Sequence, residues 1–154
     1  MTKVLIAGLG NDLRSDDGVG PAVALKVARA AGPDVTVLVN AREPADLIEV
    51  WRDADVAIVV DAMEAGLAPG STRRLDAAAL AGASLPASAS SHLLPLGHVV
   101  ELARTLGALP GRLLVFGVQG SAFGPGEGLS PGVQQAVDRV AAEILDEIGA
   151  ALAP

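Results

Sequence analysis

The 154-residue sequence contains no cysteine. Disulfide bonds, thiolate metal sites and cysteine nucleophiles are therefore excluded. Positive charge is also scarce, because 11 lysines and arginines face 18 aspartates and glutamates, which leaves a formal net charge of −7. No basic stripe is present to displace counterions from a phosphate backbone, so the composition argues against a nucleic-acid partner.

Long apolar runs are missing as well. The strongest run near the middle of the chain covers residues 56–60, far short of the ~20 residues that a membrane-spanning helix needs. The amino-terminal apolar stretch leads directly into Gly-Asn-Asp and lacks the length and the cleavage site of a secretory signal. We therefore expect a cytoplasmic protein with no membrane association.

Several well-known motifs are absent. The Gly8-x-Gly10 pair lacks the third glycine of a dinucleotide fingerprint, because position 13 is leucine, and no acidic ribose clamp follows the second apolar run at Asn40. The sequence also contains no P-loop, no H-E-x-x-H and no G-x-S-x-G. Nucleotide-cofactor chemistry and the common serine and zinc hydrolase arrangements are thus poorly supported.

The hydrophobic pattern predicts one α/β domain over residues 1–154. Apolar runs at 4–9, 35–39, 56–60 and 113–118 are typical of buried strands, and the alternating segment 71–75 is typical of an edge strand that could run antiparallel. Helical spacing follows at about 19–30, 44–51 and 95–106, and the last helix begins at Ser130, a candidate N-cap, and Pro131. Residues 77–90 are expected to form a loop. This order predicts a three-layer α/β/α sandwich with a mostly parallel five-stranded sheet.

The most informative stretch is residues 8–20, in which glycines flank an acidic loop between the first strand and the first helix. Open α/β folds bind their ligands at the ends of strands, where this loop is expected to lie. Asp16 and Asp17 could both serve as helix caps. We expect Asp16 to point away from Asp17 or to cap the helix, and Asp17 to carry the chemistry.

Three side chains are expected to meet at this edge of the sheet: Asp17, Asp61 at the end of the third strand, and His92 before a helix. Two carboxylates and one imidazole suit Ni, Zn, Mn or Fe(II), and three protein ligands leave positions open for a substrate. The alternative roles are structural, a turn cap for Asp61 and a surface loop residue for His92. His98 lies six residues further on and is expected to be solvated or packed outside the site.

These positions resemble those of the hydrogenase maturation endopeptidases. The family's pattern G-x-G-N-x-L, a spacer, D-[DE] and a glycine corresponds to residues 8–20; its strand-end aspartate corresponds to Asp61 and its Ser-His loop to Ser91-His92. The segment 120–131, which ends in Leu-Ser-Pro, is similar to the loop before the family's last helix. The resemblance departs at residues 40–44, where many members have an acidic, glycine-rich turn, and at residues 119–121, near a Pro-Glu pair in many members.

The resemblance implies removal of the C-terminal extension of a [NiFe]-hydrogenase large-subunit precursor. It also implies that Asp17, Asp61 and His92 engage nickel that the precursor supplies, with other divalent metals as substitutes. The precursor is then the expected partner, and we expect a monomer. The attacking group stays open between a metal-activated water and general-base help from Asp17.

Two other functions stay open at this point. A non-catalytic metal-sensing or chaperone module could use the same scaffold. Peptidyl-tRNA hydrolases also begin with a strand followed by G-L-G-N, although they continue with Pro-Gly and present a basic RNA-binding face, whereas this chain has Asp12-Leu13 and a net charge of −7.

Overall fold

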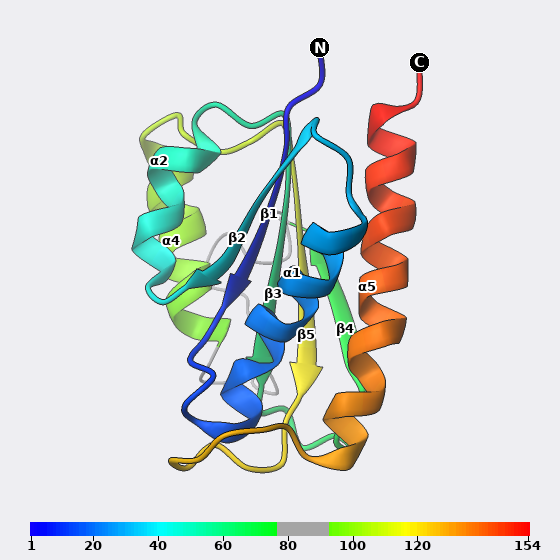
Figure 1. The fold of residues 1–154 in the computed structure, drawn as a ribbon. Helices are drawn as coiled ribbons and strands as arrows, with labels where there is room; N and C mark the ends of the chain where they lie inside the picture. Colours follow the sequence, from blue (N-terminus) through cyan, green and yellow to red (C-terminus); the bar gives the residue numbers. More distant parts are fainter. Residues whose placement is uncertain (77–92) are drawn as a thin grey trace.

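A computed structural model describes residues 1–76 and 93–154 of the chain (Figure 1). Helices cover both faces of a five-stranded sheet, which confirms the predicted three-layer α/β/α sandwich. Along the chain the elements are β1 (Val4–Leu9), η1 (Ser15–Gly18), α1 (Val19–Ala30), β2 (Val35–Ala41), η2 (Pro44–Asp46), α2 (Leu47–Trp51), β3 (Val56–Met63), β4 (Thr72–Asp76), α4 (Leu93–Thr105), β5 (Arg112–Gln119) and α5 (Pro131–Leu152). The predicted loop at 77–90 lies outside the described residues.

The sheet has the strand order β2-β1-β3-β5-β4. The first four of these strands run parallel, and β4 pairs antiparallel with β5, so the segment expected at an edge does lie there. One boundary differs in a way that matters for the site, because β3 continues past residue 60 to Met63. The extra residues keep pairing with β5, from Asp61 opposite Gly117 to Met63 opposite Gln119.

Two separate apolar cores hold the helices on the sheet. Helices α1 and α5 pack on one face, where they cover Ile6 of β1 and Ile58 and Val60 of β3. Helices α2 and α4 pack on the other face over the residues of opposite parity, such as Ala7 and Val59. Successive side chains of a strand point to opposite faces, and a strand buried on both faces needs the continuous apolar runs seen in the sequence.

The sheet reverses its direction of growth at β1. The chain passes from β1 to β2 on one side and then crosses to β3 on the other side of β1. A crevice forms at such a switch point, outside the carboxyl ends of the two strands, and this is where open α/β sheets bind ligands. Here the crevice is bordered by the loop after β1 and by the last residues of β3.

The first turn of α1 approaches the sheet so closely that only glycine fits. A Cβ on Gly20 would lie 2.2 Å from the carbonyl oxygen of Leu9 and 2.5 Å from that of Val60. Gly10 has φ +132°, and a Cβ there would lie 2.0 Å from the carbonyl oxygen of Asp17. The glycines of the opening motif thus let the acidic loop and the helix fold down onto the ends of β1 and β3.

No helix among the described residues combines the length and the apolar character needed to cross a bilayer.

We predict that Gly20→Ala lowers the free energy of unfolding by about 3 kcal/mol, because the new methyl group meets backbone atoms that cannot move aside. Gly149→Ala is the matched control, since a Cβ at that exposed position of α5 has no atom within 4 Å. The control should be neutral or stabilising by roughly 0.5–1 kcal/mol, the helix-propensity difference between the two residues. Urea unfolding of the two variants measures the difference, and equal stabilities would contradict the close approach.

Candidate active site at the carboxyl edge of the sheet

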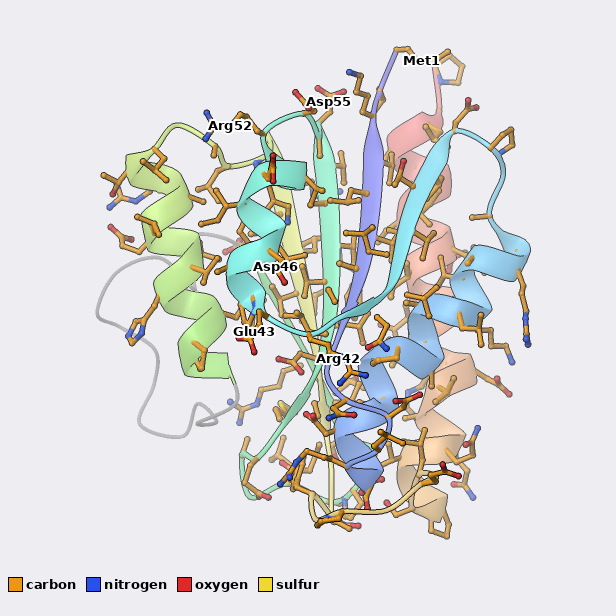
Figure 2. The ribbon with its side chains drawn as sticks, turned by 60° about the vertical axis from the view of Figure 1, so that its left-hand side comes forward. Met1, Arg42, Glu43, Asp46, Arg52 and Asp55 are labelled. Carbon is orange, nitrogen blue, oxygen red and sulfur yellow. The ribbon has the colours of Figure 1, made fainter. Side chains whose placement is uncertain are left out.

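A pocket of about 480 Å³ opens at the switch point. Residues from the ends of β1 and β2, the acidic loop, β3 and the first turn of α4 surround it. Its lining consists of Leu9, Gly10, Asn11, Asp17, Arg42, Glu43, Pro44, Asp61 and Pro95. Figure 2 shows Arg42 and Glu43 on the segment that leaves β2 towards α2. The structure therefore brings two of the three predicted site residues, Asp17 and Asp61, to one pocket.

Asp61 lies inside β3, two residues before its end, and its side chain is only 6% exposed. Its parity matches Val59 and Met63, so it belongs to the face that α2 and α4 cover. Burial raises the pKa of Asp61 well above its ordinary value, and the negative charge of Asp17 raises it further, while a hydrogen bond from the Ala62 N–H lowers it. The expected position at the strand terminus, and with it the turn-cap role, is wrong, because β3 continues to Met63.

Asp17 is half-buried in η1 and is held by the loop itself. Its Oδ2 accepts a hydrogen bond of 2.9 Å from the Asn11 N–H, and its own N–H donates to the Arg14 carbonyl at 3.1 Å. The Asn11 Oδ1 in turn accepts the Leu13 N–H at 2.9 Å, which closes a turn typical of asparagine. The N-cap of α1 is Gly18, with no side-chain cap, so neither Asp16 nor Asp17 caps this helix.

Asp16 has a role that the sequence did not predict. Its carboxylate is completely buried and joins the acidic loop to the segment before α5. It accepts the N–H groups of Ser121 (2.8 Å), Ala122 (3.0 Å) and Ser130 (2.8 Å), and the hydroxyls of Ser121 (3.3 Å) and Ser130 (2.7 Å). Burial alone would raise the pKa of Asp16, but the hydrogen bonds from Ser121, Ser130 and Ala122 outweigh it, and the pKa is lowered.

This network also changes the role of Ser130. The residue occupies the N-cap position of α5, with Pro131 in the first turn, as the sequence predicted. Its hydroxyl makes no cap hydrogen bond and donates to Asp16 instead. The start of the last helix is thereby tied to the loop that carries Asp17.

Gln119, at the end of β5, is a second structural residue that the sequence analysis missed. Its side chain is 2% exposed; Oε1 accepts the Ala65 N–H at 2.7 Å, and Nε2 donates to the Gly120 carbonyl at 2.7 Å and to Glu64 at 3.2 Å. These bonds hold the segment after β3 against the end of β5. A polar residue that ends an otherwise apolar strand was the available signal.

His92 lies outside the described residues. It directly precedes α4, whose Pro95 lines the pocket. His98 is exposed on α4 and lies outside the pocket lining, as expected. Among residues 1–76 and 93–154, no group of three or more His, Asp or Glu side chains is arranged to hold a metal ion, so Asp17 and Asp61 would need a further ligand.

Comparison with known proteins identifies related sequences. A family model described as "HycI: Hydrogenase maturation protease" matches residues 22–147. A Methanocaldococcus jannaschii protein provisionally named a hydrogenase maturation protease is 32% identical over 151 residues, which cover 94% of this chain and 96% of that protein. The hydrogenase expression/formation protein HupD of Thiocapsa roseopersicina is 31% identical over 119 residues, 76% of this chain, but the match spans only about half (54%) of HupD.

Solved structures share the fold. The hydrogenase maturating endopeptidase HybD from Escherichia coli superposes with a TM-score of 0.81 at 22% identity, over 98% of this chain and 94% of that one, and at this identity it shows the fold alone. The [NiFe] hydrogenase maturation protease HycI from Thermococcus kodakarensis superposes with a TM-score of 0.75 at 26% identity, over 94% of this chain and 91% of that one.

We predict that Asp16→Ala lowers the free energy of unfolding by about 3 kcal/mol at pH 7, because it removes a buried carboxylate that accepts three backbone N–H groups and two hydroxyls. Asp138→Ala, which removes only an exposed ion pair with Lys26, should change it by less than about 1 kcal/mol. The pKa of Asp16 is lower in the folded protein than in the unfolded chain, where it is about 3.9. Ionised Asp16 therefore contributes fully to the free energy of unfolding above about pH 3.9, and this contribution is lost as the pH falls through the pKa of the folded state. Wild type and variant should thus converge in acid, and a gap that is independent of pH would contradict the assignment.

We predict the opposite sign for Asp61→Asn, which should raise the free energy of unfolding at pH 7 by about 1–2 kcal/mol. The folded-state pKa of Asp61 is raised, so the wild type loses stability as the pH rises from the unfolded value of about 3.9 through the folded value. The asparagine has no charge to bury and should lack this decline. Thermal unfolding between pH 4 and pH 8 measures it, and a variant less stable than wild type at pH 7 would show that the ionised carboxylate is stabilising.

Proposed function

The chain belongs to the hydrogenase maturation protease family, and on that premise we propose that it is an endopeptidase that removes the C-terminal extension of a nickel-loaded [NiFe]-hydrogenase large-subunit precursor. The supporting observation is the presence of Asp17 and Asp61 in one pocket at the topological switch point. Membership of the family indicates the class of reaction, and the two carboxylates indicate where in the molecule we propose that it takes place.

The carboxylates of the pocket favour binding of a cation. Asp61 is buried, and the charge of Asp17 acts on it, so ionising Asp61 in this pocket is unfavourable. A divalent metal ion would relieve both effects, and carboxylate oxygens with an imidazole are suitable ligands for nickel. We assign the imidazole to His92, which directly precedes the helix whose Pro95 lines the pocket.

In this proposal nickel arrives as part of the substrate. Asp17, Asp61 and His92 would fill only part of its coordination sphere, and ligands from the precursor would fill the rest. A precursor without nickel would lack the atom that joins the two proteins. Recognition would therefore depend on completed metal insertion.

The two aspartates differ in how they can take part in cleavage. Nickel polarises the carbonyl of the scissile peptide bond, which makes it more susceptible to water. Asp17 is the half-buried and Asp61 the buried carboxylate, so Asp17 has the better access to an attacking water molecule and is assigned as the base. The proton taken from water would then pass to the leaving amine, while Asp61 stays in place as a ligand.

We predict that Asp17→Asn and His92→Ala each reduce processing of the nickel-loaded precursor by about 100-fold or more, because the first removes the positioned base and the second removes a proposed nickel ligand. His98→Ala is the matched control for the histidine and should process at the wild-type rate, since His98 is exposed outside the pocket. Mass spectrometry of the large subunit measures the shortening. Full activity of Asp17→Asn would remove this carboxylate from the chemistry.

The metal requirement is tested on the substrate. Nickel-free precursor should remain uncut under conditions in which the loaded precursor is shortened. Cleavage of both at the same rate would contradict the metal-dependent step. Binding of loaded precursor to the wild-type protein without any shortening would indicate a chaperone on this scaffold.

A further inference from the structure

The two edges of the sheet differ in how they are protected. Strand β4, at one edge, carries Arg73, Arg74 and Asp76, and Arg74 forms an ion pair with Glu147 of α5. Strand β2, at the other edge, has the sequence VTVLVNA, with no charged residue and no proline (Figure 1). Charges and prolines are the usual means by which proteins stop an edge strand from pairing with another chain. Of the two edge strands, only β4 carries charged residues.

The outer side of β2 offers unused backbone groups. Within residues 1–76 and 93–154, the strand pairs with β1 alone. Outside that ladder, its backbone bonds within the described residues are the Val35 N–H to the Gly32 carbonyl, and the Ala41 carbonyl from the Gly10 N–H. The latter bond faces β1, so it does not occupy the outer edge. In the part of the chain that the structure describes, no strand covers this edge.

The carboxyl end of β2 leads directly to the pocket. Arg42, Glu43 and Pro44 follow Ala41 in the chain, and all three line the pocket with Asp17 and Asp61. A polypeptide paired with the outer edge of β2 would therefore pass along this segment to the carboxylates. Extended peptides commonly bind by adding a strand to an exposed sheet edge, where main-chain hydrogen bonds supply the affinity.

We propose that the outer edge of β2 binds an extended segment of the substrate polypeptide as an additional strand and so presents the scissile region to the pocket. This inference rests on the proposed function, since it takes the precursor as the occupant. The uncharged edge, the free backbone groups and the continuity with the pocket favour a substrate chain. The continuity of this edge with the pocket would serve no purpose if the occupant were a second copy of this protein.

The kinetic test places charge on this edge at its two exposed positions, Thr36 and Asn40. The double variant Thr36→Lys/Asn40→Lys should raise KM for the nickel-loaded precursor by about tenfold and change kcat by less than about twofold, because lysine opposes edge pairing and touches no reacting group. Thr72→Lys on β4 is the matched control and should leave both constants unchanged. An unchanged KM in the β2 variant, or an equal rise in the control, would overturn the proposal.

Backbone amide hydrogen exchange gives a second readout that does not depend on turnover. The wild-type protein bound to nickel-loaded precursor, sampled before cleavage, should show slowed exchange over residues 35–41 as the outer amides gain acceptors. Slowing confined to residues 10–18 and 42–44 would overturn the edge proposal and leave the proposed function intact. Slowing that depends on the protein's own concentration without precursor would assign the edge to a second copy. A precursor that neither binds nor is cut would overturn both.

Discussion

The burial of Asp61 beside the charge of Asp17 is the constraint on which the rest of the site depends. The two carboxylates share one pocket, and the pKa of Asp61 is raised by its burial and by the charge of Asp17. Because the folded-state pKa of Asp61 is raised, ionising this carboxylate at neutral pH lowers the stability of the folded protein. The neighbouring parts of the molecule keep Asp17 and Asp61 in the same pocket.

Two structural features position Asp17 beside Asp61, and both come from residues 8–20. Glycines at positions 10 and 20 allow backbone to pack directly on backbone, so that the acidic loop and α1 reach the ends of β1 and β3. The carboxylate of Asp16 then fixes the loop to the start of α5 through five hydrogen bonds from three residues. Adjacent aspartates thus have opposite roles, since Asp16 stabilises the scaffold and Asp17 faces the pocket.

The fold was predictable from the sequence because its signals are local. Continuous apolar runs and helical spacing identified the strands, the helices and the antiparallel edge. The presence of Asp17 and Asp61 in one pocket was also predictable, since the loop after β1 and the carboxyl-terminal part of β3 lie at the same edge of a parallel sheet. The extension of β3 past Asp61 was not, because the charged Asp61 interrupts the apolar run, whereas the ladder with β5 continues through Ala62 and Met63.

The roles of Asp16 and Ser130 were beyond sequence reasoning for a different reason. Asp16 and Ser130 are 114 residues apart, and their hydrogen bonds exist only once the two loops meet. Local rules gave Asp16 and Ser130 the ordinary role of helix caps, and tertiary contacts replaced that role. His92 stays a prediction.

The nickel ion itself offers the most direct test of a coordination sphere shared between the two proteins. X-ray absorption at the nickel edge should be recorded for the loaded precursor alone and after rapid mixing with this protein, before cleavage. The account predicts that oxygen and nitrogen ligands are added on mixing, and that the oxygen contribution falls when Asp61→Asn replaces the wild type. A nickel spectrum unchanged by a protein that still binds and cuts the precursor would contradict it.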